Sequence, residues 1–106
     1  MGRFVICAYK PKPGKEIDLL TAVRKHIQVL DAEGLVSERP PYAMVAQDGT
    51  IIEVFEWKSA EAIKQAHTNP AVHALWAEFG AACDYIPLTN LGECHQMFAE
   101  FEPIEL

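Results

Sequence analysis

The stretch that decides the fold is Gln47-Asp-Gly-Thr-Ile-Ile-Glu-Val-Phe-Glu-Trp-Lys-Ser-Ala-Glu-Ala-Ile-Lys-Gln-Ala-His-Thr-Asn-Pro-Ala-Val-His-Ala-Leu-Trp76. Asp48-Gly49 is the strongest short hairpin signal in the chain, because glycine tolerates the positive φ of a tight turn. A strand ending at Trp57 follows, and Ser59 is a good N-cap for a helical segment over residues 60–67. Asn69 caps a second helix that Pro70 opens, where the missing N–H is harmless. The stretch predicts a hairpin, a strand and two helical segments.

Strand and helix signals precede this stretch. Residues 4–9 are a short apolar run that ends in a Lys-Pro-Lys-Pro-Gly turn, which is typical of a strand. Residues 15–33 change to helical spacing, and Gly34 followed by Leu35 predicts a Schellman-type end. A further strand is expected over residues 42–47. The buried stripe of the helix is expected to contain Ile17, Leu19, Leu20, Val23, Ile27 and Leu30.

After this stretch, the helix that begins at Pro70 carries one apolar stripe. Residues 84–92 contain turn-forming residues but are too apolar for a free loop, so we expect them to lie across another element. Residues 94–102 alternate in polarity and predict a last strand, which Pro103 ends. The apolar stripe of the helix that begins at Pro70 consists of Val72, Leu75, Trp76, Phe79 and Cys83.

The order of these elements is β-α-β-β-α-β in one domain spanning residues 1–106, the plan of a ferredoxin-like α+β sandwich with an antiparallel sheet. Helices cover one face of such a sheet. The first strand is nevertheless apolar on both faces, with Phe4 and Ile6 on one and Val5 and Cys7 on the other. Because both faces then need cover, we expect a two-fold homodimer that forms a dimeric α+β barrel.

The composition excludes several classes of partner. The formal charge is −6, and no cluster of Lys and Arg is present, which argues against nucleic acid or an anionic membrane as the main partner. The apolar run near the N-terminus is too short for a signal peptide or a membrane span, so we expect a soluble cytoplasmic protein. Three cysteines at long spacings indicate buried thiols in a reducing compartment, with neither a disulfide framework nor a zinc site.

Three segments resemble the antibiotic biosynthesis monooxygenase family of the dimeric α+β barrel superfamily. They are Lys12-Pro-Gly-Lys15 at the start of the first helix, Gly34-Leu35 at its end, and Glu53-Val-Phe-Glu-Trp-Lys-Ser59 leading into Glu61-Ala and Ala66-His67. The resemblance covers nearly the whole chain. It implies a small homodimeric protein that oxidises a quinol-like aromatic or polyketide-like compound without metal or flavin. A non-catalytic ligand-binding or structural dimer is the alternative.

His67 is the catalytic residue that the resemblance implies, because many members of the family have a histidine there. A histidine can serve as the general base that removes a phenol proton and so raises the electron density that O2 needs. The alternative is that His67 caps its helix at the surface. A second histidine of the family corresponds to Val72 here, and His73 is one position away. Because one helical position turns a side chain by about 100°, His73 does not take over that role.

The substrate-binding residues are expected to be Tyr9, Trp57, Trp76 and Tyr85. Aromatic side chains of this kind, together with Phe79, can form a wall for a planar ligand, although Trp76 and Phe79 on a helical stripe also suit a simple core. Glu53 and Glu56 point to opposite faces of their strand, so at most one carboxylate points inward as an acid/base candidate. Core hydrogen bonding is the default expectation for Tyr9 and His95.

No metal or cofactor is expected. No histidine pair has the spacing of ligands on one helix face, such as His-x-x-x-His. The heme-degrading relatives have a proximal histidine where this chain has Trp76, and a heme-contacting tryptophan where it has Ala66. The first strand also lacks the asparagine that those relatives use. Among the activities of the family, the resemblance then implies a cofactor-independent, monooxygenase-like function.

Overall fold

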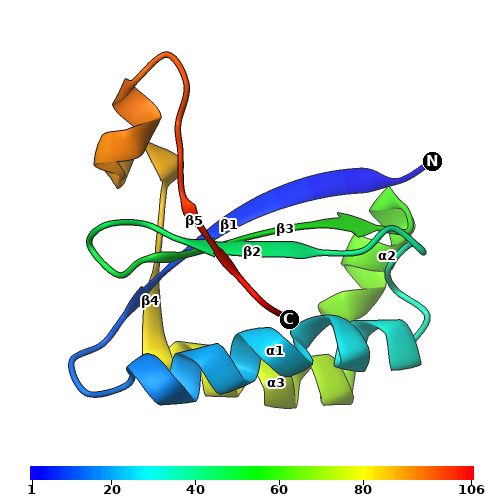
Figure 1. The fold of residues 1–106 in the computed structure, drawn as a ribbon. Helices are drawn as coiled ribbons and strands as arrows, with labels where there is room; N and C mark the ends of the chain where they lie inside the picture. The colour runs from blue at the N-terminus through cyan, green and yellow to red at the C-terminus, as the bar shows by residue number, and fades with distance from the viewer.

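The computed structural model describes residues 1–106 and forms one α+β unit (Figure 1). Three α-helices and two 3-10 turns combine with five strands. No helix is long and apolar enough to cross a membrane. In chain order the elements are β1 (Arg3–Pro11), α1 (Glu16–Ala32), β2 (Tyr42–Val45), β3 (Ile51–Trp57), α2 (Ala60–Ala66), α3 (Pro70–Ala82), β4 (Cys83–Ile86), η1 (Leu88–Asn90), η2 (Gly92–His95) and β5 (Glu102–Ile104).

The strands form an open antiparallel sheet in the order β4-β1-β3-β2-β5. β1 and β3 pair in the centre, with Arg3 opposite Trp57 and Tyr9 opposite Ile51. Helices α1 and α3 lie against one face, and the segment with η1 and η2 rises on the other side (Figure 1). Side chains opposite each other in an antiparallel pair share a face, so this register decides which residues meet the helices.

The local signals at the element ends are confirmed. The Ser59 hydroxyl accepts a hydrogen bond from the N–H of Ala62, and the Asn69 side chain accepts one from Val72. At the end of α1, Gly34 has φ +71°, and the N–H of Leu35 donates to the carbonyl of Leu30 at 3.0 Å. These are the bonds of a cap and of a Schellman motif.

The buried stripe of α1 differs from the predicted one. Ile17 is 80 % exposed, and Leu20 and Ile27 lie half-buried at the edges of the helix face. The helix is therefore rotated relative to the predicted stripe, because packing against the sheet and α3 decides which of several apolar positions turns inward. The residues of α1 that face the core are Leu19, Ala22, Val23, His26 and Leu30.

The predicted last strand over residues 94–102 is wrong. The edge of the sheet next to β1 is filled by β4, which follows α3 without a loop and pairs Tyr85 with Tyr9. Residues 92–95 form a 3-10 turn, and only β5 returns to the sheet, beside β2. Alternating polarity does not itself supply a pairing partner, and the edge beside β1 is occupied by the segment that directly follows α3.

The segment 84–92, predicted to lie across another element, does so only after β4: residues 84–86 belong to the edge strand, and residues 87–92 lie across the sheet. Leu91 is buried against Ala8 and Ile52 on the face away from the helices. This segment covers only part of that face. Phe4, Ile6 and Tyr42 remain 63 %, 52 % and 65 % exposed on it. Two of the three cysteines are at least half-buried, whereas Cys94 is exposed, which corrects the expectation of buried thiols for that residue.

Candidate active site

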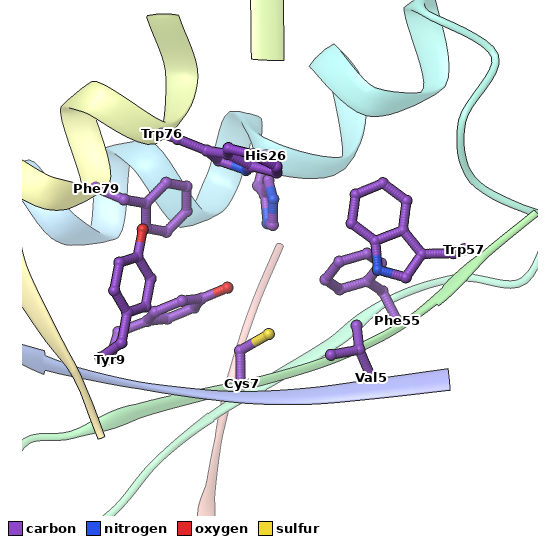
Figure 2. A pocket seen from close by; sticks show the side chains of 9 residues that line it. Val5, Cys7, Tyr9, His26, Phe55, Trp57, Trp76 and Phe79 are labelled. Atoms are coloured by element: carbon purple, nitrogen blue, oxygen red, sulfur yellow. The ribbon is translucent and has the colours of Figure 1, made fainter. Parts of the chain in front are cut away.

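A cavity of about 380 Å³ lies between the inner face of the sheet and the two long helices. This volume is at the lower end of the range of small-molecule sites. Figure 2 shows β1 and β3 on one side and the side chains from α1 and α3 on the other. The lining residues are Val5, Cys7, Tyr9, His26, Phe55, Trp57, Trp76, Phe79 and Tyr85.

A cluster of three polar side chains lies at this wall, and we call it the Glu53 cluster. Glu53, on β3, is completely buried. Its Oε1 accepts a hydrogen bond from the hydroxyl of Tyr9 at 2.8 Å. The same oxygen lies 2.7 Å from Nδ1 of His26 on α1, which is 4 % exposed. Two donors on one carboxylate oxygen offset the cost of removing that oxygen from water.

The geometry of the Glu53 cluster assigns the proton on Nδ1 of His26. A carboxylate oxygen only accepts hydrogen bonds, so the short contact requires Nδ1–H as donor. Nε2 of a neutral His26 then carries a lone pair. Nε2 of His26 and Oε2 of Glu53 are both buried and have no hydrogen-bond partner in the protein. Of these two atoms, only Nε2 belongs to a residue that lines the cavity, and an unpaired buried polar atom is costly.

Aromatic rings fix the orientation of His26. Its ring centroid lies 5.1 Å from that of Phe55 and 4.9 Å from that of Phe79, both in edge-to-face geometry. Figure 2 shows the imidazole extending from α1 into the space between these rings. Phe79 also contacts Tyr9, with centroids 4.9 Å apart. The aromatic packing and the bond to Glu53 together leave the imidazole little freedom to turn.

Burial keeps the neighbouring acids of the cavity protonated. The pKa of Tyr9 is raised far above its usual range by burial and then by the nearby charge of Glu53, so its phenol remains a donor. Burial also raises the pKa of the Cys7 thiol. It raises the pKa of Tyr85 to about 12. The phenols of Tyr9 and Tyr85 and the thiol of Cys7 therefore stay protonated at neutral pH.

The four predicted substrate-binding residues are brought together by the fold, since Tyr9, Trp57, Trp76 and Tyr85 all line the cavity. Trp57 is buried and Trp76 is half-buried, whereas Tyr85 is exposed at the edge. Tyr9 is also hydrogen-bonded in the core, as expected. Whether these four residues bind a substrate stays a prediction.

His67 lies elsewhere. It is the C-cap of α2 and is exposed, with its ring 5.3 Å from the ring of Trp76 and outside the set of lining residues. His73 is exposed beside it and is hydrogen-bonded through Nε2 to the backbone carbonyl of His67. His95 is exposed and bonded to the carbonyl of Thr89, so core hydrogen bonding was the wrong expectation for it.

His26 is the residue that sequence reasoning missed. It follows Leu19 and Val23 at spacings of seven and three and so continues their buried helix face. That spacing is the signal in the sequence that could have identified His26. Glu53 and Glu56 are the two acid/base candidates that the alternation of the strand predicts. The structure confirms that only Glu53 points inward, because Glu56 is paired with Arg39 at 3.0 Å on the opposite face.

The side chains do not form a metal-binding group, since no three His, Cys, Asp or Glu residues converge. What the site offers is a hydrogen-bonded histidine beside an apolar, aromatic cavity. Such an arrangement can take up a proton from a bound compound. Comparison of the chain with family models, with curated proteins and with solved structures gives no match.

Proposed function

We propose that the chain is a cofactor-independent, monooxygenase-like protein that acts on a small aromatic, quinol-like or polyketide-like compound. The observation that carries this proposal is the Glu53 cluster, two of whose members, Tyr9 and His26, line the aromatic cavity. Membership of the antibiotic biosynthesis monooxygenase family is part of the proposal. Helices on one face of a sheet ordered β4-β1-β3-β2 support it, since a ferredoxin-like sandwich has this arrangement.

In this mechanism His26 is the general base. The substrate lies among the aromatic rings with its acidic O–H or C–H at Nε2 of His26. Nε2 takes the proton, and the carboxylate of Glu53 stabilises the imidazolium that forms. Tyr9 keeps the carboxylate oriented through its hydrogen bond. This differs from the role predicted for His67, because His26 and not His67 lies at the cavity.

Loss of the proton raises the electron density of the ring, which can then react with O2. Where a ring methylene becomes a carbonyl, one oxygen atom of O2 enters the product. The other oxygen atom leaves as water together with the two methylene hydrogens. The protein supplies the base and excludes water, and O2 is the only oxidant required.

A homodimer belongs to the same proposal. The sheet face away from the helices exposes Phe4, Ile6 and Tyr42, and contiguous apolar surface of this kind is typical of an interface. A second copy with the same face would cover it by two-fold symmetry. The cavity lies between the sheet and the helices, on the opposite face, so the dimer would leave the chemistry of each chain intact.

The test uses anthrone, a three-ring ketone with an acidic methylene group. We expect the purified protein to consume O2 and form anthraquinone faster than buffer does. His26→Gln should lower the rate by about 100-fold or more, the usual contribution of a general base. His95→Gln, which changes an exposed histidine in η2, is the matched control.

His67→Ala decides between the two histidines. If His67→Ala abolishes conversion and His26→Gln does not, the base is the residue predicted from the sequence. If neither substitution changes the rate, proton abstraction by a histidine is wrong. Circular dichroism of each variant shows whether a lost rate reflects lost folding.

A non-catalytic ligand-binding protein is the second candidate. The observation that favours it is that the free atoms of the Glu53 cluster are fully buried and the other lining residues are hydrophobic. A binding protein would hold aromatic compounds with an affinity that His26→Gln changes, yet would give no O2 uptake. Calorimetry and an oxygen electrode on the same sample distinguish the two functions.

A further inference from the structure

We propose that the cavity selects an uncharged hydroxyaromatic compound over the corresponding aromatic carboxylate. The inference rests on the proposed function, because it concerns the ligand of the same cavity. It specifies the ionic state in which the substrate binds. The substrate enters as a neutral weak acid and becomes an anion only when His26 takes its proton.

The cavity wall offers no fixed positive charge. Eight of its nine lining residues are hydrophobic, and the remaining one is His26. None of the nine Lys and Arg residues of the chain is among them. A carboxylate or phosphate that entered would lose its water without gaining a cation in return, which costs several kcal/mol.

Arg3 lies opposite Trp57 at the end of β1, but its side chain is exposed and is not among the lining residues. Three other cations are engaged in contacts away from the cavity. Lys25, one position before His26, pairs with Glu78 at the surface. Lys12 donates to the backbone carbonyl of Gly80 at 2.9 Å. Arg39 pairs with Glu56 and lies over the ring of Phe4, on the opposite face of the sheet. None of these side chains compensates a second buried anion beside Glu53.

The Glu53 cluster adds a charge that repels anions. The side chain of Glu53 is buried, and its hydrogen-bond partners are the phenol of Tyr9 and the imidazole of His26. A ligand carboxylate would bring a like charge into the same low-dielectric region. A neutral hydroxyl group meets no such repulsion. Nε2 of His26 is a buried acceptor without a partner, so it can receive the hydroxyl hydrogen when the ligand displaces the side chains that cover it.

Three ligands with the same two-ring frame test the inference: 2-naphthol, 2-naphthoate and (2-naphthylmethyl)trimethylammonium. At pH 7 they are neutral, anionic and cationic, so their calorimetric dissociation constants compare three charge states on one aromatic frame. We expect 2-naphthol to bind at least about tenfold more tightly than 2-naphthoate, a difference of about 1.4 kcal/mol. Equal or tighter binding of 2-naphthoate would overturn the inference. Tightest binding of the ammonium compound would overturn it too, in favour of a cation held by aromatic rings.

Failure of the inference is distinguishable from failure of the proposed function. If none of the three compounds binds, the cavity is not a ligand site, and both proposals are wrong. If 2-naphthoate binds as well as 2-naphthol while anthrone is converted, only the charge preference is wrong.

A substitution at the cavity wall gives an independent measurement. Val5 is half-buried on the inner face of β1 and lines the cavity. Val5→Lys places a cation there, and we expect it to shift the ratio of the two dissociation constants at least about tenfold towards 2-naphthoate. Val5→Met, an uncharged chain of similar reach, should leave the ratio unchanged. An unchanged ratio in a folded Val5→Lys protein would contradict the inference, and the three ligands test the unaltered protein if Val5→Lys does not fold.

Discussion

Glu53 places a carboxyl group in the core between the sheet and the helices, where burying a charge is costly. Replacing a buried ionic cluster by apolar side chains of similar volume often leaves the stability of a protein unchanged or raises it. Tyr9 and His26 offset part of the cost through one carboxylate oxygen, but the second oxygen has no partner. A cluster that stability alone does not require is therefore consistent with a role in chemistry.

Stability at alkaline pH follows from the buried thiol of Cys83 on β4. Burial, followed by the charge of Asp84, raises the pKa of Cys83 from 9.0 to about 11. The unfolded chain thus loses this proton at a lower pH than the folded chain does, so the contribution to stability is complete below pH 9 and is lost towards pH 11. We expect the free energy of unfolding in urea to fall between these values.

The matched variants for this prediction are Cys83→Ala and Cys94→Ala. Cys83→Ala should weaken the dependence of the unfolding free energy on pH over this range. Cys94→Ala should not, because the Cys94 thiol is exposed. An identical pH dependence in both variants would show that other groups, such as Tyr85 with a pKa raised to about 12, account for the alkaline loss.

Helix ends are decided by backbone geometry, and two glycines show this in opposite ways. Gly34 ends α1 with φ +71°, a conformation that costs an L-residue about 1 kcal/mol or more. Gly80 lies inside α3 on an exposed position, and an added Cβ there meets no atom within 4 Å. Glycine is needed at the first position and only weakens the helix at the second.

Gly34→Ala should therefore lower the free energy of unfolding by about 1 kcal/mol. Gly80→Ala should raise it by about 0.5–1 kcal/mol, because alanine loses less backbone entropy in a helix. Urea denaturation followed by circular dichroism measures both changes. The opposite signs are the distinctive result, and a loss of stability in Gly80→Ala would refute the assignment of an open helical position.

The whole molecule leaves one face of its sheet half covered. The segment from Leu88 to Phe101 buries the end of this face near Ala8, while Phe4, Ile6 and Tyr42 stay exposed at the other end. Under the proposed dimer, these side chains meet their counterparts in a second chain. Removing these apolar side chains from water would then provide the free energy of association.

Light scattering at micromolar concentration tests this association. We expect the mass of two chains for the unaltered protein and of one chain for Ile6→Glu, since an unpaired carboxylate at the centre of an apolar interface is costly. Ile17→Glu is the control, because Ile17 is an exposed isoleucine on α1, away from the sheet. A monodisperse single chain in the unaltered protein would exclude the dimer.

The sequence by itself determined the features that depend on neighbouring residues. The Asp48-Gly49 turn, the caps at Ser59 and Asn69, and the end of α1 at Gly34 all rest on hydrogen bonds within a few residues, so their pattern is visible in the chain. The inward position of one glutamate on β3 also followed from alternation alone. Tyr9 and Trp57 on the predicted strands and Trp76 on the predicted helix stripe do line the cavity.

Only the tertiary structure decided which side chains meet. Glu53 and His26 are 27 residues apart, and Glu53 and Tyr9 are 44 apart, so their contact depends on the register of β1 with β3 and on the rotation of α1. The last strand was misplaced for the same reason, because the free edge beside β1 was filled by β4 directly after α3. Packing chooses among local possibilities that are nearly equal in energy. The candidate base therefore moved from His67 to His26 only when strands and helices were seen together.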